Sequence, residues 1–299
     1  MGANQSGGCC AARRRSTRTA PPDSRRRSIL PKVSIALMGN SIIYYNDTPR
    51  LLEAFGGSDL FDQGIVEQDS CLRGGVGLSQ LLAKGNGMEA KFGADDHGSP
   101  DVASLLARPW DYVVINDYTQ ACAWRVHGGC MTCACGVRMS CLWWVRGTCA
   151  WGVCIACAWC AWHVHATFER CTHTQAPARA ASRLASIGVL VDQIVPLLRR
   201  CGGTPVLLET WAYRAHTKGS DDLGDHAEFT SRLQEGYREY AAALAAALPP
   251  EVQPRVAPVG TAFFAVHERR PDMWRELFHT DGVHPSPLGS YLVVRSMVT

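Results

Sequence analysis

Long apolar runs are missing from this chain. No stretch approaches the roughly 18 uninterrupted apolar residues that a membrane-spanning helix needs. The first residues also lack the apolar core of a secretory signal peptide. We therefore expect a protein that neither spans a membrane nor is secreted by that route. At 299 residues the chain is long enough for one large α/β domain or for two smaller domains.

Acidic residues are scarce in two segments, which makes the charge distribution uneven. Residues 1–28 hold seven Arg and one Asp, and residues 121–175 hold four Arg and one Glu. Since the whole chain has a formal charge of only +3, the remainder is net acidic. A nucleic acid would find a basic surface on the N-terminal arm alone, and we predict no nucleic-acid partner.

Cysteine is scarce outside one block. Ten of the fourteen cysteines lie between Cys122 and Cys171, so the rest of the chain is not a disulfide scaffold. The block at 121–175 contains the near-repeats CAWRVH, CAWGVC and CAWHVH, which alternating TG/CG-rich DNA would encode. The flanking Thr-Gln-Ala at 119–121 recurs at 174–176. We favour the interpretation that the block is a retained intron, because its removal would restore a strand, a short loop and a helix.

Two other interpretations of this block stay open. Cys130-x2-Cys133 and Cys154-x2-Cys157 have nearly the spacing of a zinc-knuckle site, although CxxC pairs also arise by chance in so cysteine-rich a segment. A disordered surface insertion that is prone to oxidation fits the composition as well. We predict no metal and no cofactor for the protein.

The N-terminal arm, residues 1–32, holds almost nothing that could be buried, and we expect it to be disordered. Its first six residues match the N-myristoylation pattern, with Gly2 as the acceptor, and Cys9 and Cys10 could be palmitoylated. Together with two arginine triplets, these signals would hold a protein on the cytoplasmic face of a membrane. The alternatives are an organellar transit peptide and a mis-assigned start codon.

From Val33 onward, apolar runs alternate with helical patterns. The expected strands are 33–39, 111–116, 204–211 and 255–260, and the expected helices lie near 49–55, at about 178–200 and 226–248, and from about 287. Such a pattern indicates a parallel sheet covered on both faces, a three-layer α/β/α sandwich. We expect one domain in two parts, 33–120 and 176–299, with the second part ending inside its last helix.

Polar motifs follow several of these apolar segments. Ser41 leaves the first strand within Gly39-Asn40-Ser41, where a glycine allows a tight exit and presents the hydroxyl at the sheet edge. Near the other end, Asp281-Gly282-Val283-His284 places a carboxylate three residues before an imidazole. One ring nitrogen could then meet the carboxylate while the other takes a serine proton. Each motif alone is more typical of a turn or a helix cap than of a catalytic site.

Two further groups could stabilise an oxyanion. Gly74-Gly75 lets a backbone N–H approach without a side chain in the way, and Asn116 offers a side-chain amide at the end of a strand. Both are also common in loops and turns.

Taken in order, GNS, GG, a strand-end Asn and DxxHP resemble the four sequence blocks of the SGNH hydrolase superfamily, the GDSL-like serine esterases. The segments VAPVGTAF (256–263) and LFHTDGVHPSPLGSYL (277–292) are similar to its final strand and histidine block. The resemblance covers roughly 33–120 and 176–299. It implies a flavodoxin-like sheet and a metal-independent serine hydrolase that cleaves carboxylic esters through an acyl-enzyme.

The resemblance also implies roles for individual residues. Ser41 would be the nucleophile, His284 the general base and Asp281 its orienting acid. The oxyanion hole would consist of the backbone N–H groups of Ser41 and Gly75 and the side chain of Asn116.

The sequence departs from the family pattern at two positions. GNS replaces the commoner GDS, and Val114 stands where glycine is usual. Trp211 and Tyr213 could line a substrate pocket or simply pack at the end of a strand. The ester could be a small molecule, a lipid or a carbohydrate. The alternative functions are a membrane-tethered, non-catalytic protein with the SGNH fold and a hydrolase with a zinc-binding insert.

Overall fold

The computed structural model describes residues 33–56, 66–88, 98–123, 183–214 and 223–298. The basic arm, with its candidate acylation sites Gly2, Cys9 and Cys10, lies outside these residues, and so does the predicted insertion from residue 124 onward.

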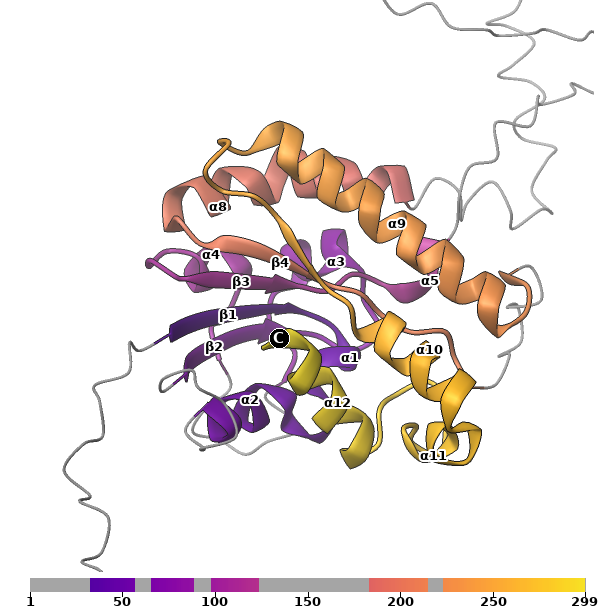
Figure 1. The fold of residues 1–299 in the computed structure, drawn as a ribbon. Helices are drawn as coiled ribbons and strands as arrows, with labels where there is room; N and C mark the ends of the chain where they lie inside the picture. The colour runs from indigo at the N-terminus through magenta and orange to yellow at the C-terminus, as the bar shows by residue number, and fades with distance from the viewer. Residues whose placement is uncertain (1–32, 57–65, 89–97, 124–182, 215–222, 299) are drawn as a thin grey trace, which may run out of the picture.

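Five parallel strands form one sheet in the order β2-β1-β3-β4-β5 (Figure 1). The strands are β1 (Val33–Gly39), β2 (Val66–Leu72), β3 (Tyr112–Ile115), β4 (Thr204–Leu208) and β5 (Arg255–Ala257). This is the strand order of a flavodoxin-like, doubly wound sheet, and the predicted three-layer α/β/α architecture is confirmed. Because β1 is followed by β2 on one side and by β3 on the other, the topological switch point lies at the carboxyl ends of β1 and β3.

Helices cover both faces of the sheet. They are α1 (Ser41–Tyr44), α2 (Thr48–Gly56), α3 (Leu78–Lys84), α4 (Val102–Leu105), α5 (Thr119–Ala123), α8 (Val195–Cys201), α9 (His226–Ala247), α10 (Val259–Arg269), α11 (Pro271–Glu276) and α12 (Pro287–Met297). A 3-10 turn, η1, spans Tyr45–Asp47, and a π-helical turn, η2, spans Leu190–Ile194. Within the described parts of the chain, no helix is both long and apolar enough to cross a membrane.

Alternation along the strands divides the core in two. Ala36 and Met38 of β1 point to a cluster that packs against α3, α4, α5, α8 and α9. Ile35 and Leu37 point to the opposite cluster, which packs against α1, α2, α10, α11 and α12. Figure 1 shows α8 and α9 above the sheet and α2 and α12 below it. The helix that begins with Ser41, α1, and the helix that follows His284, α12, therefore lie on the same face of the sheet.

The main difference from the sequence prediction is β2, which the apolar pattern did not indicate. Glu67, Gln68 and Asp69 interrupt its apolar character. The strand lies at an edge of the sheet and pairs only with β1, so it is not required to be apolar throughout. The predicted strand at 255–260 is shorter than expected, because it ends at Ala257 and Pro258 already caps α10.

The start of the predicted insertion is part of the folded body. Cys122 lies in α5 and is fully buried, and its backbone carbonyl accepts a hydrogen bond from Nε of Arg183 at 2.8 Å. Arg183 also pairs with Glu239 of α9 at 3.1 Å. Arg183, the first residue described after the gap, therefore contacts α5, the last helix described before it.

Candidate active site

Ser41 is the first residue of α1 and is separated from the end of β1 by one residue, Asn40. Asn40 caps this helix, because its side-chain oxygen accepts a hydrogen bond from the backbone N–H of Ile42 at 3.1 Å. Gly39 has no room for a side chain, since a Cβ there would lie 2.8 Å from the Cβ of Asn116. The tight exit presents the Ser41 hydroxyl at the carboxyl edge of the sheet.

The structure brings Ser41, Asp281 and His284 together. The Ser41 Oγ lies 2.8 Å from Nε2 of His284, a residue 243 positions later in the chain. The other ring nitrogen, Nδ1, lies 2.7 Å from Oδ2 of Asp281. The imidazole can therefore take a proton from the hydroxyl while the carboxylate holds the opposite nitrogen.

The surroundings of Asp281 stabilise its ionised form. Its Oδ1 accepts hydrogen bonds from the backbone N–H groups of Val283 at 2.8 Å and His284 at 2.9 Å. Partial burial opposes its ionisation, but the hydrogen bonds from the His284 ring and the two N–H groups outweigh burial and lower the pKa of Asp281 to about 2. The carboxylate is consequently charged at neutral pH and accepts the Nδ1 proton of His284.

The predicted pocket residues Trp211 and Tyr213 occupy different places. Trp211 is fully buried and stacks on Phe263 with ring centroids 4.3 Å apart, and its indole N–H donates to the Val283 carbonyl at 3.0 Å. This side chain supports the loop that carries His284 from within the core, and a role for Trp211 at a substrate pocket stays a prediction. Tyr213 is half-buried and meets Phe229 edge-on at 5.4 Å, and its role at a pocket stays a prediction.

Arg214 holds the same loop from another side. Its backbone N–H donates to the Gly282 carbonyl at 2.8 Å. Its guanidinium donates to the carbonyls of Arg275 at 3.2 Å and Thr280 at 3.4 Å. Trp211 and Arg214 both follow β4, so the exit of this strand fixes the position of the acid and the base.

The three residues assigned to the oxyanion hole follow three neighbouring strands. Ser41 comes after β1, Gly75 after β2 and Asn116 after β3, and β1 lies between the other two. Gly75 is exposed and has a φ of 69°, in the left-handed region that favours glycine. Asn116 is buried; its Oδ1 accepts from the Asn40 N–H at 3.2 Å and its Nδ2 donates to the Asp117 carbonyl at 2.9 Å.

Asn40 ties these strand ends together. Its side-chain Nδ2 donates to the carbonyls of Val76 at 3.1 Å and Asp117 at 3.3 Å. A carboxylate could not donate these two hydrogen bonds. The buried Asp117 adds to the network by accepting from the Leu78 N–H at 3.0 Å and from the Tyr240 hydroxyl at 2.9 Å.

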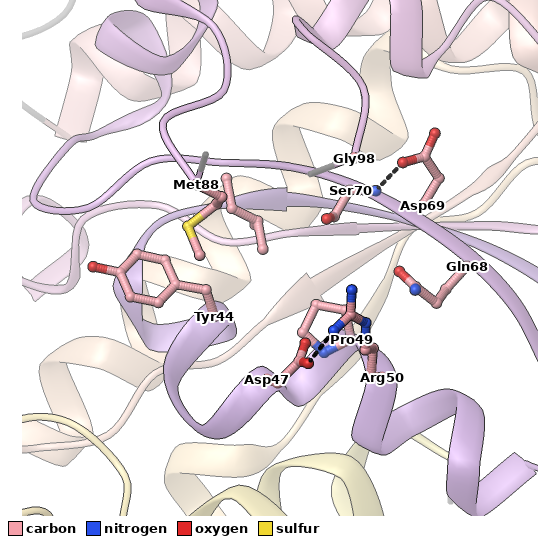
Figure 2. A pocket seen from close by; sticks show the side chains of 10 residues that line it. Tyr44, Asp47, Pro49, Arg50, Gln68, Asp69, Ser70, Met88 and Gly98 are labelled. Atoms are coloured by element: carbon pink, nitrogen blue, oxygen red, sulfur yellow. Dashed lines mark hydrogen bonds and ion pairs between the residues drawn. The ribbon is translucent and has the colours of Figure 1, made fainter. Parts of the chain in front are cut away.

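A cavity of about 40 Å³ lies on the β2 side of α1 (Figure 2). Tyr44, the last residue of α1, lies beside Met88 in its wall, and Arg50 pairs with Asp47 at 3.3 Å on its rim. The Tyr44 hydroxyl also lies against Gly74, where a Cβ would come within 2.6 Å of it. The helix that begins with Ser41 thus contacts the glycine turn after β2 through its last residue.

Metal ligands are not grouped in the described parts of the chain. No three His, Cys, Asp or Glu side chains among those residues could hold a metal ion. The CxxC pairs that could form a zinc site lie outside the described residues, and the described cysteines Cys71, Cys122 and Cys201 are buried, free thiols.

Comparisons with known proteins find similarity in structure only. No protein-family model matches the chain, and no curated protein matches its sequence. A DUF4886 family protein from Bacteroides uniformis ATCC 8492 is 14% identical over 90% of this chain and 82% of its own, with a TM-score of 0.54. At this identity the likeness shows the fold alone, a parallel five-stranded sheet between two layers of helices.

Two other solved structures match less closely in shape. A protein described as an SGNH hydrolase from Slackia heliotrinireducens is 20% identical over 90% of this chain and 98% of its own, with a TM-score of 0.48. A protein described as an acylhydrolase from Bacteroides fragilis NCTC 9343 is 15% identical over 90% of this chain and 88% of its own, with a TM-score of 0.39. At these identities the likeness concerns the fold alone.

The sequence motifs did not point to three residues around the site. Tyr45 stacks on His284, Asn46 binds the segment after His284, and Arg214 anchors the loop before it. Of these three, only Asn46 could have been noticed in the sequence, because Asn is one of the few residues other than glycine that is enriched in left-handed turns.

Proposed function

We propose that this protein is a serine hydrolase that cleaves carboxylic esters through an acyl-enzyme intermediate. The observation that carries the proposal is the continuous path of contacts from the Ser41 Oγ through the two ring nitrogens of His284 to Asp281, at 2.8 and 2.7 Å. Serine is a poor nucleophile without such a base, and the base needs a partner to fix its tautomer.

The proposed reaction runs in two halves. His284 Nε2 takes the Ser41 proton as Oγ attacks the ester carbonyl carbon, and the resulting imidazolium is stabilised by Asp281. His284 then gives this proton to the leaving alcohol as the carbon–oxygen bond breaks, which leaves an acyl group on Ser41. In the second half, His284 takes a proton from water as the water oxygen attacks the acyl carbon. His284 then returns this proton to the Ser41 Oγ as the bond between Oγ and the acyl carbon breaks, which releases the free acid.

The oxyanion formed in each half needs donors aimed at it. We propose the backbone N–H groups of Ser41 and Gly75 and the Asn116 amide for this role. Their positions after adjacent strands support the assignment. One hydrogen of the Asn116 Nδ2 is used by the Asp117 carbonyl, and an amide NH₂ has a second hydrogen to donate.

The substrate we propose is a small-molecule, lipid or carbohydrate ester. Acylation at Gly2, Cys9 or Cys10 would bring the enzyme to the cytoplasmic face of a membrane. Mass spectrometry of the N-terminal peptide from cells tests this placement, and an unmodified peptide would contradict it.

The test of the catalytic proposal compares the full chain with its Ser41→Ala variant. We expect p-nitrophenyl acetate hydrolysis and fluorophosphonate labelling by the parent chain, with both lost in the variant. Since the chain holds fourteen cysteines that could react with an activated ester, mass mapping of the label to Ser41 is required. Ser79→Ala, at an exposed position on α3, is the matched control and should behave as the parent chain.

A folded parent chain that neither turns over acetyl, longer acyl and carbohydrate esters nor takes the label would contradict the proposal. That result would favour the non-catalytic, membrane-tethered alternative.

A further inference from the structure

An aromatic ring covers one face of the imidazole that touches Ser41. The rings of Tyr45 and His284 stack with centroids 4.0 Å apart and an angle of 7° between their planes. Tyr45 lies in η1, directly after the short helix that begins with Ser41. The nucleophile and the ring that covers its base therefore come from one stretch of five residues.

The backbone around Tyr45 is fixed to both halves of the site. The Tyr45 carbonyl accepts hydrogen bonds from the hydroxyls of Thr48 at 2.9 Å and Ser290 at 3.4 Å. The next residue, Asn46, has a φ of 54°, a conformation that needs compensation in a residue other than glycine. Its side-chain amide donates to the carbonyl of Pro285 and to the Ser290 hydroxyl, each at 2.9 Å. Because Pro285 adjoins His284, this contact sets the spacing between the two rings.

Polar side chains contact both ring nitrogens of His284. Ser41 lies at Nε2 and Asp281 at Nδ1. His279 lies 3.5 Å from the same Asp281 oxygen, and its ring meets Tyr45 edge-on at 5.5 Å. The Tyr45 ring face is thus the aromatic surface presented to His284, and such faces attract cations.

We propose that Tyr45 is a positioning residue for His284: its ring holds the imidazole plane in line with Ser41 and stabilises the imidazolium that forms when the serine proton is taken. This inference rests on the proposed esterase function. Tyr45 contacts neither the reacting oxygen nor the acyl group, and it acts through His284 alone.

The experiment is a series of substitutions at position 45 in the full chain, read as pH profiles of kcat and kcat/KM for p-nitrophenyl acetate. Tyr45→Phe and Tyr45→Trp keep the ring face and should stay within about twofold of the parent kcat. Tyr45→Leu removes it and should lower kcat roughly three- to tenfold with KM unchanged. The acid limb of the Leu variant should move about half a unit to lower pH, because the imidazolium loses a stabilising neighbour.

A second substitution separates electrostatics from packing. Pentafluorophenylalanine at position 45 keeps the shape of phenylalanine but removes the negative potential of its face. We expect the acid limb of this variant to move in the same direction as in Tyr45→Leu, which keeps the test valid if the Leu variant fails to fold. Tyr291→Leu is the matched control, because Tyr291 is exposed on α12 and meets Phe55 edge-on at 5.3 Å.

Two results would overturn the inference. One is a folded Tyr45→Leu or fluorinated variant with the parent kcat and acid limb, and the other is a Tyr45→Phe variant as impaired as Tyr45→Leu. An NMR titration of labelled histidines measures the protonation of His284 in each variant without any turnover, and the signal missing from His284→Gln assigns this residue. If the parent chain hydrolyses no ester, the proposed function fails, while an unchanged His284 titration across the series would be a separate failure of the stacking inference.

Discussion

The two sides of the candidate site are built in different ways. On the acid–base side, side chains 243 positions apart in the sequence meet directly, and the loop that carries Asp281 and His284 is held by Trp211 and Arg214. On the oxyanion side, the ends of three adjacent strands are joined by hydrogen bonds from Asn40 and to Asp117. The acid–base side therefore depends on the position of one loop, whereas the oxyanion side follows from the sheet itself.

The largest predicted effect breaks the acid–base side. Asp281→Asn keeps the shape but offers an amide to Nδ1 of His284, so kcat for ester hydrolysis should fall on the order of 10⁴-fold. Asp272→Asn, at an exposed ion pair with Arg270 on α11, is the control and should leave kcat unchanged. A loss below tenfold in Asp281→Asn would show that the acid–base side does not work as a unit.

The next effect breaks the oxyanion side. Asn116→Ala should lower kcat on the order of 100-fold to 1000-fold with little change in KM, because one oxyanion donor is lost. The same change leaves the buried Asn40 N–H without its acceptor, so the free energy of unfolding should also drop by about 1–3 kcal/mol. A variant that is destabilised but fully active would remove Asn116 from the oxyanion hole and leave it a structural role only.

Asn40 separates family pattern from local chemistry. Asn40→Asp creates the GDS sequence that is commoner in the superfamily which the motifs resemble, yet it places a carboxylate against the carbonyls of Val76 and Asp117. We expect a lower free energy of unfolding, by about 1–3 kcal/mol in denaturant melts, because two acceptors lose their donor. Asn40→Ser keeps the helix cap but not the donors, so its free energy of unfolding should lie between those of the parent chain and Asn40→Asp. An Asn40→Asp variant as stable as the parent chain would contradict the proposed role of these hydrogen bonds.

A smaller effect compares two glycines with matching geometry. Gly75 and Gly202 have φ values of 69° and 71°, and a Cβ at either would have nothing within 4 Å. Replacing either by Ala should therefore cost about 1 kcal/mol of stability through backbone strain alone. Only Gly75→Ala should also reduce kcat, since Gly202 ends α8 away from the site. Equal kcat in both variants would remove the Gly75 N–H from the oxyanion hole.

The smallest effect is the pH dependence of stability on the acid–base side. The folded pKa of Asp281, about 2, lies below the value of about 3.9 for an unfolded Asp. Its ionisation therefore contributes stability that is fully present above about pH 4 and is lost as the pH falls toward 2. The stability difference between the parent chain and Asp281→Asn should shrink over that interval in acid melts. A difference that shrinks near neutral pH would mean that Asp281 is not held as an anion.

Much of the fold could be predicted because its central strands are buried on both faces. β1, β3 and β4 show as apolar runs, and the long amphipathic α9 lies where its pattern places it. β2 could not be recognised, since its polar residues satisfy an edge position that only the tertiary structure defines.

The same division applies to the site. The motif order of the resemblance indicated that Ser41, Asp281 and His284 would meet, and their contacts agree with that expectation. The place of Trp211 could not be predicted, because its indole N–H finds a partner in a loop 72 residues away. Tyr45 was missed for a similar reason, because nothing near it in the sequence shows that its ring stacks on His284.

The contact between Arg183 and Cys122 has a consequence for the length of the chain. Both residues belong to the folded body and are already in contact, so the segment between them closes a loop whose ends are held together. The entropy of closing such a loop grows only with the logarithm of its length, by about 0.6 kcal/mol for each doubling. At this junction, the fold can therefore accommodate connecting segments that differ by dozens of residues while the geometry of its sheet is retained.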